Sequence, residues 1–299
     1  MARKLLALAA VALLAAGCGS AAHPSASNRL FLTKTRLKVA RIGSLQQAIS
    51  KASAVALPGG KLMILGGYTG STSVDTIAAG LPNNLRVVGH LPQPTHDAAA
   101  VLLGSSVYLF GGGSSVSTPS VVRVSLAGNA AEAPALDEPL SDLGAVTLGG
   151  RAYLVGGYTG TQFATAILRY DPAGGTKVVA RLPQGLRYAG VAAAGHAIFV
   201  AGGLTTSGPS RVVYAVSPGG KPKKVASLPK PEDHAALAVL GDTLFLIGGR
   251  QVIAIGLRTD VITVAARLPE RLTDPSVATV GNRIIVAGGG TNGVWALTP

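Results

Sequence analysis

Six glycine doublets recur along this 299-residue chain at nearly constant spacing. Successive doublets lie 45, 45, 46, 46 and 40 residues apart, and a period of this length indicates a repeat fold. Each doublet ends a short apolar run such as LMILGG or VYLFGG, which is typical of a buried strand that stops at a tight backbone position. The doublets are Gly66-Gly67, Gly111-Gly112, Gly156-Gly157, Gly202-Gly203, Gly248-Gly249 and Gly288-Gly289.

A leucine stands twenty residues before each of the last five doublets, and four of these leucines are followed by proline. An alanine-rich run and the run that ends at the doublet follow the leucine. A third apolar run comes after a Gly, Ser and Thr loop, and most units add a fourth. Four strands per period is a propeller blade, so the sequence predicts an all-β, six-bladed β-propeller of four-stranded blades. The leucines are Leu91, Leu136, Leu182, Leu228 and Leu268. The expected third strands are 121–126, 166–170, 212–216 and 252–257, and the expected fourth strands are 86–88, 177–180, 223–226 and 261–265.

The two ends of the repeat region predict how the ring closes. The chain stops ten residues after Gly289, which leaves room for a third strand at 294–297 but none for a fourth. Residues 37–42 (LKVARI) match the fourth-strand pattern at 177–182 (KVVARL). We therefore expect this N-terminal strand to complete the last blade and hide two unpaired sheet edges; the alternative is that it is a linker.

The pattern of leucine-proline, polar residues, alanine-rich run and apolar run ending in two glycines resembles the Kelch repeat of the galactose oxidase superfamily. The resemblance covers about residues 30–299 and implies a six-bladed Kelch-type propeller. Of the family's later tyrosine and tryptophan, only Tyr170, Tyr214 and Trp295 stand in third-strand positions. The copper radical site of galactose oxidase needs a cysteine joined to a tyrosine, and the only cysteine of this chain is Cys18.

The first 17 residues have the pattern of a targeting segment. Two positive charges precede an apolar run of twelve residues at 5–16, which is too short to span a bilayer. The tetrad AAGC that ends at Cys18 resembles a bacterial lipobox, in which that cysteine becomes acylated. We predict a lipoprotein signal peptide at 1–17, a flexible tether with a lipidated Cys18 at 18–29 and a propeller at 30–299, held on the extracytoplasmic face of a cell membrane. An ordinary secretory signal is the alternative.

The charge balance favours anionic partners. The 26 Lys and Arg residues fall to 24 without Arg3 and Lys4, against 13 Asp and Glu residues, a net charge of +11. Outside the cytoplasm, such a chain suits lipid headgroups, a glycan or an anionic envelope polymer. A partner protein is a further option. Nucleic acid is not expected, because the chain has no recognition module and no basic stripe with aromatics.

The loops that lead into the innermost strands supply the candidate site. Five and six residues after each of the five leucines stands a polar pair, and alignment of the alanine run places a sixth pair in the first blade. Every blade thus offers a polar pair at the axis, on a scaffold that is otherwise mostly alanine. These pairs form either a ligand pocket, with Lys51 and Arg187 available for a carboxylate, or solvated loops whose charges pair around the ring. Two tyrosines in Tyr-Thr-Gly tripeptides after doublets, Tyr68 and Tyr158, are expected on the same rim. The pairs are Ser50-Lys51, His96-Asp97, Ser141-Asp142, Arg187-Tyr188, Asp233-His234 and Thr273-Asp274.

No catalytic motif accompanies these residues. The chain has no G-x-S-x-G, H-E-x-x-H or Walker-type sequence, and we expect no cofactor and no metal site, although His and Asp pairs would suit a divalent ion. A binding or interaction module is therefore the first functional hypothesis. The alternative is a sugar mutarotase or epimerase, which the resemblance to Kelch-type sialic acid mutarotases implies and which needs only one acid and one base.

Overall fold

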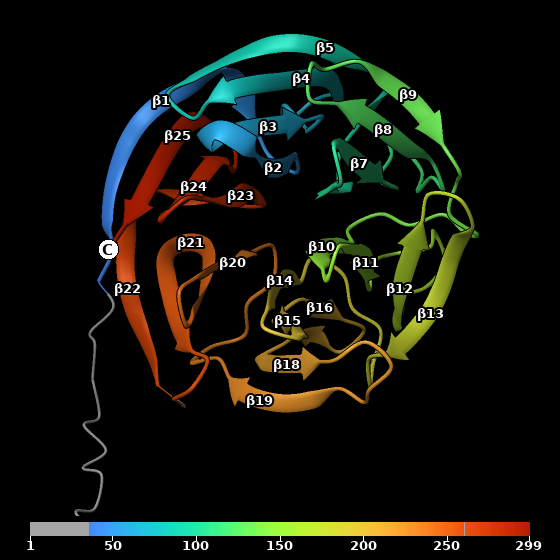
Figure 1. Cartoon of the computed structure of the whole chain (residues 1–299). Coiled ribbons are helices and arrows are strands. Elements are labelled where there is room, and N and C mark those ends of the chain that lie inside the picture. The colour runs from blue at the N-terminus through green and yellow to red at the C-terminus, as the bar shows by residue number, and fades with distance from the viewer. Residues whose placement is uncertain (1–35, 260) are drawn as a thin grey trace, which may run out of the picture. The chain divides into compact units, whose positions relative to one another are not determined.

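The computed structural model describes residues 36–259 and 261–299. Six antiparallel sheets surround a central axis as blades, one for each glycine doublet (Figure 1). The predicted all-β, six-bladed propeller is therefore confirmed. The described residues include no helix that is both long and apolar enough to span a membrane. The predictions for the signal peptide, Cys18 and the tether fall on residues outside the described ranges.

Blades 1 to 3 each hold four strands in chain order. Blade 1 contains β2 (Ser53–Leu57), β3 (Lys61–Leu65), β4 (Val74–Leu81) and β5 (Asn84–Thr95), with a 3₁₀ turn at Pro58–Gly60. Blade 2 contains β6 (Ala99–Leu103), β7 (Ser106–Phe110), β8 (Val121–Ser125) and β9 (Ala130–Ala133). Blade 3 contains β10 (Gly144–Leu148), β11 (Arg151–Val155), β12 (Ala166–Asp171) and β13 (Gly175–Arg181).

Blades 4 to 6 depart from this plan in detail. Blade 4 contains β14 (Gly190–Ala194), β15 (Ala197–Ala201), β18 (Val212–Val216) and β19 (Lys223–Ser227), and its loop carries the hairpin β16 (Leu204–Thr205) and β17 (Gly208–Pro209). Blade 5 contains β20 (Ala236–Leu240), β21 (Thr243–Gly256) and β22 (Ile262–Leu272). Blade 6 contains β23 (Pro275–Val280), β24 (Arg283–Gly288), β25 (Thr291–Thr298) and β1 (Lys38–Ile49).

Blade 5 differs from the other blades because its sheet is built from three strand elements. The expected second and third strands are both present as the two halves of β21, which folds back on itself (Figure 1) near Gly249, where φ is +57°. The Leu257 amide donates to the Asp242 carbonyl, so the two halves lie side by side. Blade 5 lacks the Gly, Ser and Thr loop of blades 1 to 4, and the tight turn leaves the ladder unbroken.

The ring closes as the sequence predicted. Strand β1 pairs antiparallel with β25 from Lys38 opposite Thr298 to Ile49 opposite Thr291. All six blades and the closing strand therefore lie inside the compact unit Lys34–Pro299. Every ring contact is made within this unit, so we treat it as able to fold on its own.

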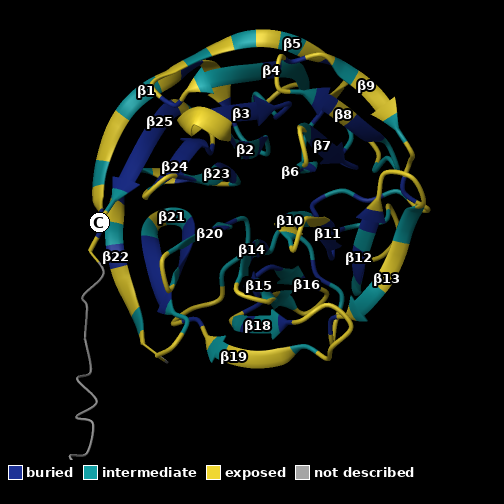
Figure 2. Ribbon diagram, in the orientation of Figure 1, coloured by how far each residue is buried: buried dark blue, intermediate teal, exposed yellow. Residues whose placement is uncertain are grey.

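The apolar core is divided into six clusters, each between two neighbouring blades. The cluster between blades 1 and 2 includes Met63, Leu65 and Val107, and the cluster on the other side of blade 1 includes Leu62 and Ile64. Alternate residues of β3 thus face opposite neighbours, which explains why second strands are apolar at almost every position. Figure 2 shows the exposed residues concentrated on the outer strands. The five spacing leucines are all buried, at 1–5% exposure.

The alternation of strands gives the propeller two faces. The upper face carries the loops after the doublets and the loops that lead into the first strands. The lower face carries the turns between first and second strands and those between third and fourth strands. Strand β1 begins on the lower face.

Candidate polar site on the upper face

The glycine doublets position the predicted polar pairs. In blade 3, the Gly157 amide donates to the Leu186 carbonyl at 2.9 Å, and Leu186 directly precedes the polar pair of blade 4. A Cβ atom on Gly156, whose φ is +60°, would lie 2.5 Å from the same carbonyl oxygen. Equivalent contacts join the doublets of blades 1, 2 and 4 to the next blade. Only glycine permits this approach, so each of these doublets holds the functional loop of its neighbour.

The second residue of each pair adopts a strained backbone. Every non-glycine residue with a left-handed φ in the described chain is one of these six, with φ between 49° and 58°. Such conformations cost roughly 1–3 kcal/mol each and gather at functional sites. The six residues are Lys51, Asp97, Asp142, Tyr188, His234 and Asp274.

Backbone hydrogen bonds between these six residues link the blades around the axis. Five bonds run from the amide of one residue to the carbonyl of the equivalent residue in the preceding blade, at 2.8–3.0 Å. In the described chain, the step from blade 4 to blade 5 has no such bond. Tyr188 and His234 instead stack there, with ring centroids 3.9 Å apart. The bonds join Lys51 to Asp274, Asp97 to Lys51, Asp142 to Asp97, Tyr188 to Asp142 and Asp274 to His234.

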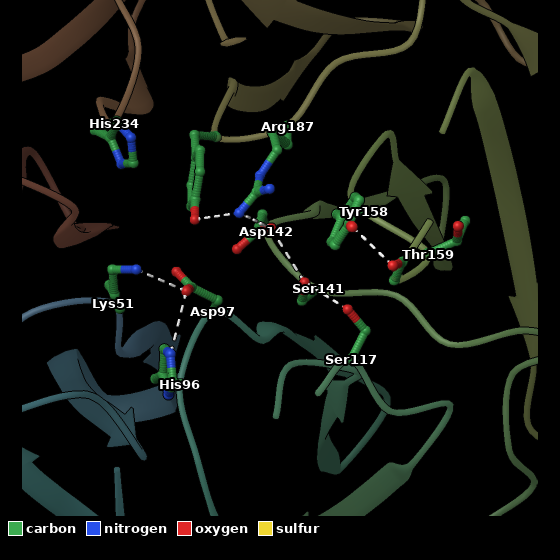
Figure 3. Close-up of polar contacts among 12 residues, drawn as sticks. Lys51, His96, Asp97, Ser117, Ser141, Asp142, Tyr158, Thr159, Arg187 and His234 are labelled. Atoms are coloured by element: carbon green, nitrogen blue, oxygen red, sulfur yellow. Dashed lines mark hydrogen bonds and ion pairs between the residues drawn. The ribbon is translucent and has the colours of Figure 1, made fainter. Parts of the chain in front are cut away.

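The charged side chains pair around the ring (Figure 3). Lys51 Nζ lies 2.9 Å from Asp97 Oδ2, and Arg187 Nη2 lies 2.7 Å from Asp142 Oδ2. His234 Nδ1 lies 2.8 Å from Asp274 Oδ1. Each pair joins neighbouring blades. Lys51 and Arg187, which the sequence offered for a ligand carboxylate, each hold an aspartate instead.

The buried carboxyls have raised pKa values. Burial and the neighbouring Asp97 raise the pKa of Asp142 to about 6, although the Arg187 guanidinium opposes the change. Burial also raises the pKa of Asp97, against the opposing effect of Lys51. The Asp142 side chain is only 2% exposed, so burial is the dominant cause.

The pKa values of the two histidines, His96 and His234, are shifted in opposite directions. Burial and the nearby Lys51 charge lower the pKa of His96, which favours a neutral imidazole. The hydrogen bond to Asp274 raises the pKa of His234 in spite of burial. His96 belongs to blade 2 and His234 to blade 5, three blades apart. The described residues hold no group of three or more His, Cys, Asp or Glu side chains arranged for a metal ion.

Aromatic rings surround the Arg187 guanidinium. Its Cζ lies 4.8 Å from the Tyr158 ring centroid, 5.5 Å from that of Phe163 and 4.5 Å from that of Tyr188. Burial raises the pKa of Tyr188 to about 12, which keeps the phenol protonated. These contacts, together with the ion pair to Asp142, hold Arg187 in one orientation.

A pocket of about 420 Å³ opens beside this ring of side chains. The second residues of the pairs in blades 1 to 4 form one wall, and the loops after the doublets of blades 2 and 3 form the other. A second, smaller cavity of about 180 Å³ lies on the axis, between the second residues of the pairs and the starts of the first strands. The polar residues of the pocket are Lys51, His96, Asp97, Ser114, Ser115, Ser117, Ser141, Asp142, Tyr158, Arg187 and Tyr188.

The predicted residues differ in which space they line. Those of blades 2 to 4 and Lys51 meet at the pocket, while the second residues of all six pairs, including His234 and Asp274, line the axial cavity. Asp233, Thr273 and the Ser50 side chain form no side-chain hydrogen bond or ion pair within the described residues. Of the two rim tyrosines, Tyr158 lines the pocket, whereas Tyr68 packs on His96 with ring centroids 5.0 Å apart.

Three contributors were not predicted. Ser117 bonds the Ser141 hydroxyl at 2.9 Å, and Phe163 packs on Arg187. Ser73 is the third, since its hydroxyl lies 2.8 Å from His96 Nδ1. All three belong to loops after the doublets, whose lengths and sequences vary. The sequence signal available was only that these loops share a face with the polar pairs.

Comparisons with known proteins establish the fold and no more. A solved structure of YjhT matches with a TM-score of 0.73 at 14% sequence identity, covering 86% of this chain and 95% of that chain. No protein-family profile matches the sequence. No curated protein matches either. At this identity, the likeness supports a common propeller architecture.

Proposed function

We propose that the propeller binds a carbohydrate in the pocket on its upper face. The observation that carries this proposal is the pocket wall itself, where serine hydroxyls, carboxylates and tyrosine rings converge on about 420 Å³. Hydroxyl, carboxylate and guanidinium groups exchange hydrogen bonds with sugar hydroxyls, and aromatic faces pack on sugar rings. The strained backbone of six consecutive blades places these groups.

The internal ion pairs favour a neutral sugar over an acidic one. Both cations of the pocket already hold an aspartate from a neighbouring blade, at 2.9 Å and 2.7 Å. An anionic ligand would have to displace those carboxylates, whereas a neutral sugar can share the paired groups as donors and acceptors. The ring therefore offers a ligand ion-paired groups as hydrogen-bond donors and acceptors, rather than unpaired charges.

A glycan-array screen of Lys34–Pro299 tests the proposal. Tyr158→Ala and Ser141→Ala should each reduce affinity for any glycan hit by roughly tenfold or more, because both residues line the pocket. Tyr68→Ala is the matched control, since Tyr68 occupies the same tripeptide outside the pocket, and it should change affinity less. Absence of any hit, or hits that all variants retain, would contradict carbohydrate binding.

A sugar mutarotase is the second candidate. His96, kept neutral by its lowered pKa, and Asp142, with a pKa of about 6, line the same pocket. A base can take the proton of an anomeric hydroxyl while an acid protonates the ring oxygen, so that the ring opens and closes again with the other anomer. NMR exchange between anomers of a bound sugar should accelerate with the protein, and His96→Gln should abolish the acceleration without abolishing binding. Unchanged exchange rates would leave binding as the function.

We also propose that the chain is a lipoprotein anchored through Cys18 on the extracytoplasmic side of the membrane. The lipobox-like AAGC after an apolar run supports this. Metabolic labelling with an alkynyl fatty acid should mark the wild-type chain and leave Cys18→Ser unlabelled. Equal labelling of both chains, or of neither, would rule out the anchor.

A further inference from the structure

The lower face carries an excess of positive charge that the upper face lacks. Among the described residues of the lower-face turns and their flanking strand ends, eight are Lys or Arg and two, Asp171 and Asp242, are acidic. The upper-face loops hold more acidic residues than basic ones. Of the two faces, the lower one therefore carries the positive excess, while further cations lie on the outer strands between them.

The lower-face cations are exposed and mostly unpaired. Lys61, Arg151 and Lys223 are exposed and form no ion pair within the described residues. Asp242 is occupied by Arg258, at 3.2 Å. Unpaired cations on one face attract an extended anionic surface. The remaining cations of this face are Arg36, Lys38, Lys221 and Arg283.

Exposed apolar side chains accompany these cations. Leu81, Leu126 and Val261 lie in lower-face turns between third and fourth strands, with 50%, 41% and 41% exposure. A crevice of about 340 Å³ brings Arg283 to the same surface as Leu81, with Ile42 and Pro82 beside it. Exposed apolar residues among cations are typical of surfaces that enter the headgroup region of a membrane.

We propose that the lower face docks on an anionic phospholipid bilayer and presents the upper-face pocket away from the membrane. Phosphate headgroups pair with Lys61, Arg151, Lys223 and Arg283, while Leu81 enters the acyl boundary. Strand β1 begins on this same face, with Arg36 just before it. The inference requires neither acylation of Cys18 nor the sugar pocket.

Vesicle co-sedimentation of Lys34–Pro299 tests the docking face. The protein should bind vesicles of mixed phosphatidylglycerol and phosphatidylcholine and not phosphatidylcholine alone, and about 1 M salt should release it. The triple variant Lys61→Glu, Arg151→Glu, Lys223→Glu should weaken binding at least about 100-fold. The control triple Arg181→Glu, Lys230→Glu, Arg250→Glu changes the net charge equally on the upper face and should weaken binding several-fold at most.

A second measurement reports which face enters the bilayer. A Leu81→Trp variant should shift its fluorescence to the blue on binding, whereas Val116→Trp, at a 76% exposed upper-face position, should not. The proposal would be overturned if the wild-type protein did not bind the anionic vesicles. It would also be overturned if both triple variants lost equal amounts of vesicle binding. Binding of a soluble anionic polysaccharide in place of vesicles would overturn it in favour of an envelope polymer.

Discussion

The two faces of the propeller use the same residue types in different ways. On the upper face, charged side chains are paired between blades and glycines are packed against carbonyls, as at Arg187 with Asp142 and at Gly156. On the lower face, Arg151 has no ion-pair partner among the described residues, and a Cβ on Gly149 would meet nothing within 4 Å. The repeat therefore packs tightly at the mouth where six loops meet, whereas the glycines of the opposite turns between first and second strands have open space around them.

The largest expected effect compares two glycines with equal backbone strain. Gly156 has φ +60° and Gly149 has φ +57°, but only Gly156 faces a carbonyl, whose oxygen would lie 2.5 Å from an alanine Cβ at this position. We expect Gly156→Ala to lower the free energy of unfolding by more than about 3 kcal/mol and Gly149→Ala by about 1 kcal/mol, measured by denaturant unfolding. Similar losses would show that backbone strain alone, and not packing, distinguishes the faces.

The next effect concerns the paired and unpaired arginines. Arg187→Met leaves the Asp142 carboxyl buried without its partner, which should cost about 3 kcal/mol of unfolding free energy. Arg151→Met on the lower face should change stability by less than about 0.5 kcal/mol. Adding Asp142→Asn to Arg187→Met should recover most of the loss. Equal small losses of unfolding free energy at both arginines would mean that the upper-face ion pair does not stabilise the fold.

The raised pKa of Asp142 gives the upper face a dependence on pH. The native carboxyl, with a pKa of about 6, holds its proton where the unfolded one, near 3.8, has lost it. Its contribution to stability is therefore greatest below pH 4 and falls by roughly 2 kcal/mol as the pH rises to about 6. The difference in unfolding free energy between wild type and Asp142→Asn, measured across this range, should follow that curve. A constant difference would contradict the raised pKa.

His234 should give the smallest of the four effects. Its pKa is raised by Asp274, so its stabilisation is complete below pH 6.5 and is lost as the pH rises through the native pKa. The side chain is 29% exposed, which weakens the effect relative to the buried Asp142. His234→Gln should remove the decline of thermal stability above pH 6.5. If thermal stability still declined above pH 6.5 in the variant, the decline would belong to a titratable group other than His234.

The architecture was predictable because a propeller repeats its constraints. The doublets of blades 1 to 4 each admit a carbonyl of the next blade, and each spacing leucine is buried between two blades. Period and offset together therefore predict six blades and their closure. The continuity of β21 in blade 5 was not predicted, because a doublet reads the same in sequence whether a loop or a tight turn follows it.

The site was predictable only in position. The leucine offsets and the alanine run of the first blade indicated six pairs whose second members are adjacent around the axis, but the sequence did not reveal that these members carry the left-handed backbone. It also did not separate Asp142, which is buried and paired, from Asp233, which forms no side-chain bond within the described chain. Sequence spacing records where a loop lies and not which partner its side chain meets.

Local periodicity and glycine geometry were enough to predict the repeat, the six blades, the closing strand and the positions of the polar pairs. The folded ring was needed to show that Lys51 and Arg187 are neutralised by neighbouring blades, that the pocket is lined by blades 1 to 4, and that the lower face carries unpaired cations. These outcomes depend on contacts between residues about 45 positions apart, such as Lys51 with Asp97 and Asp142 with Arg187, which exist only once the blades have packed side by side.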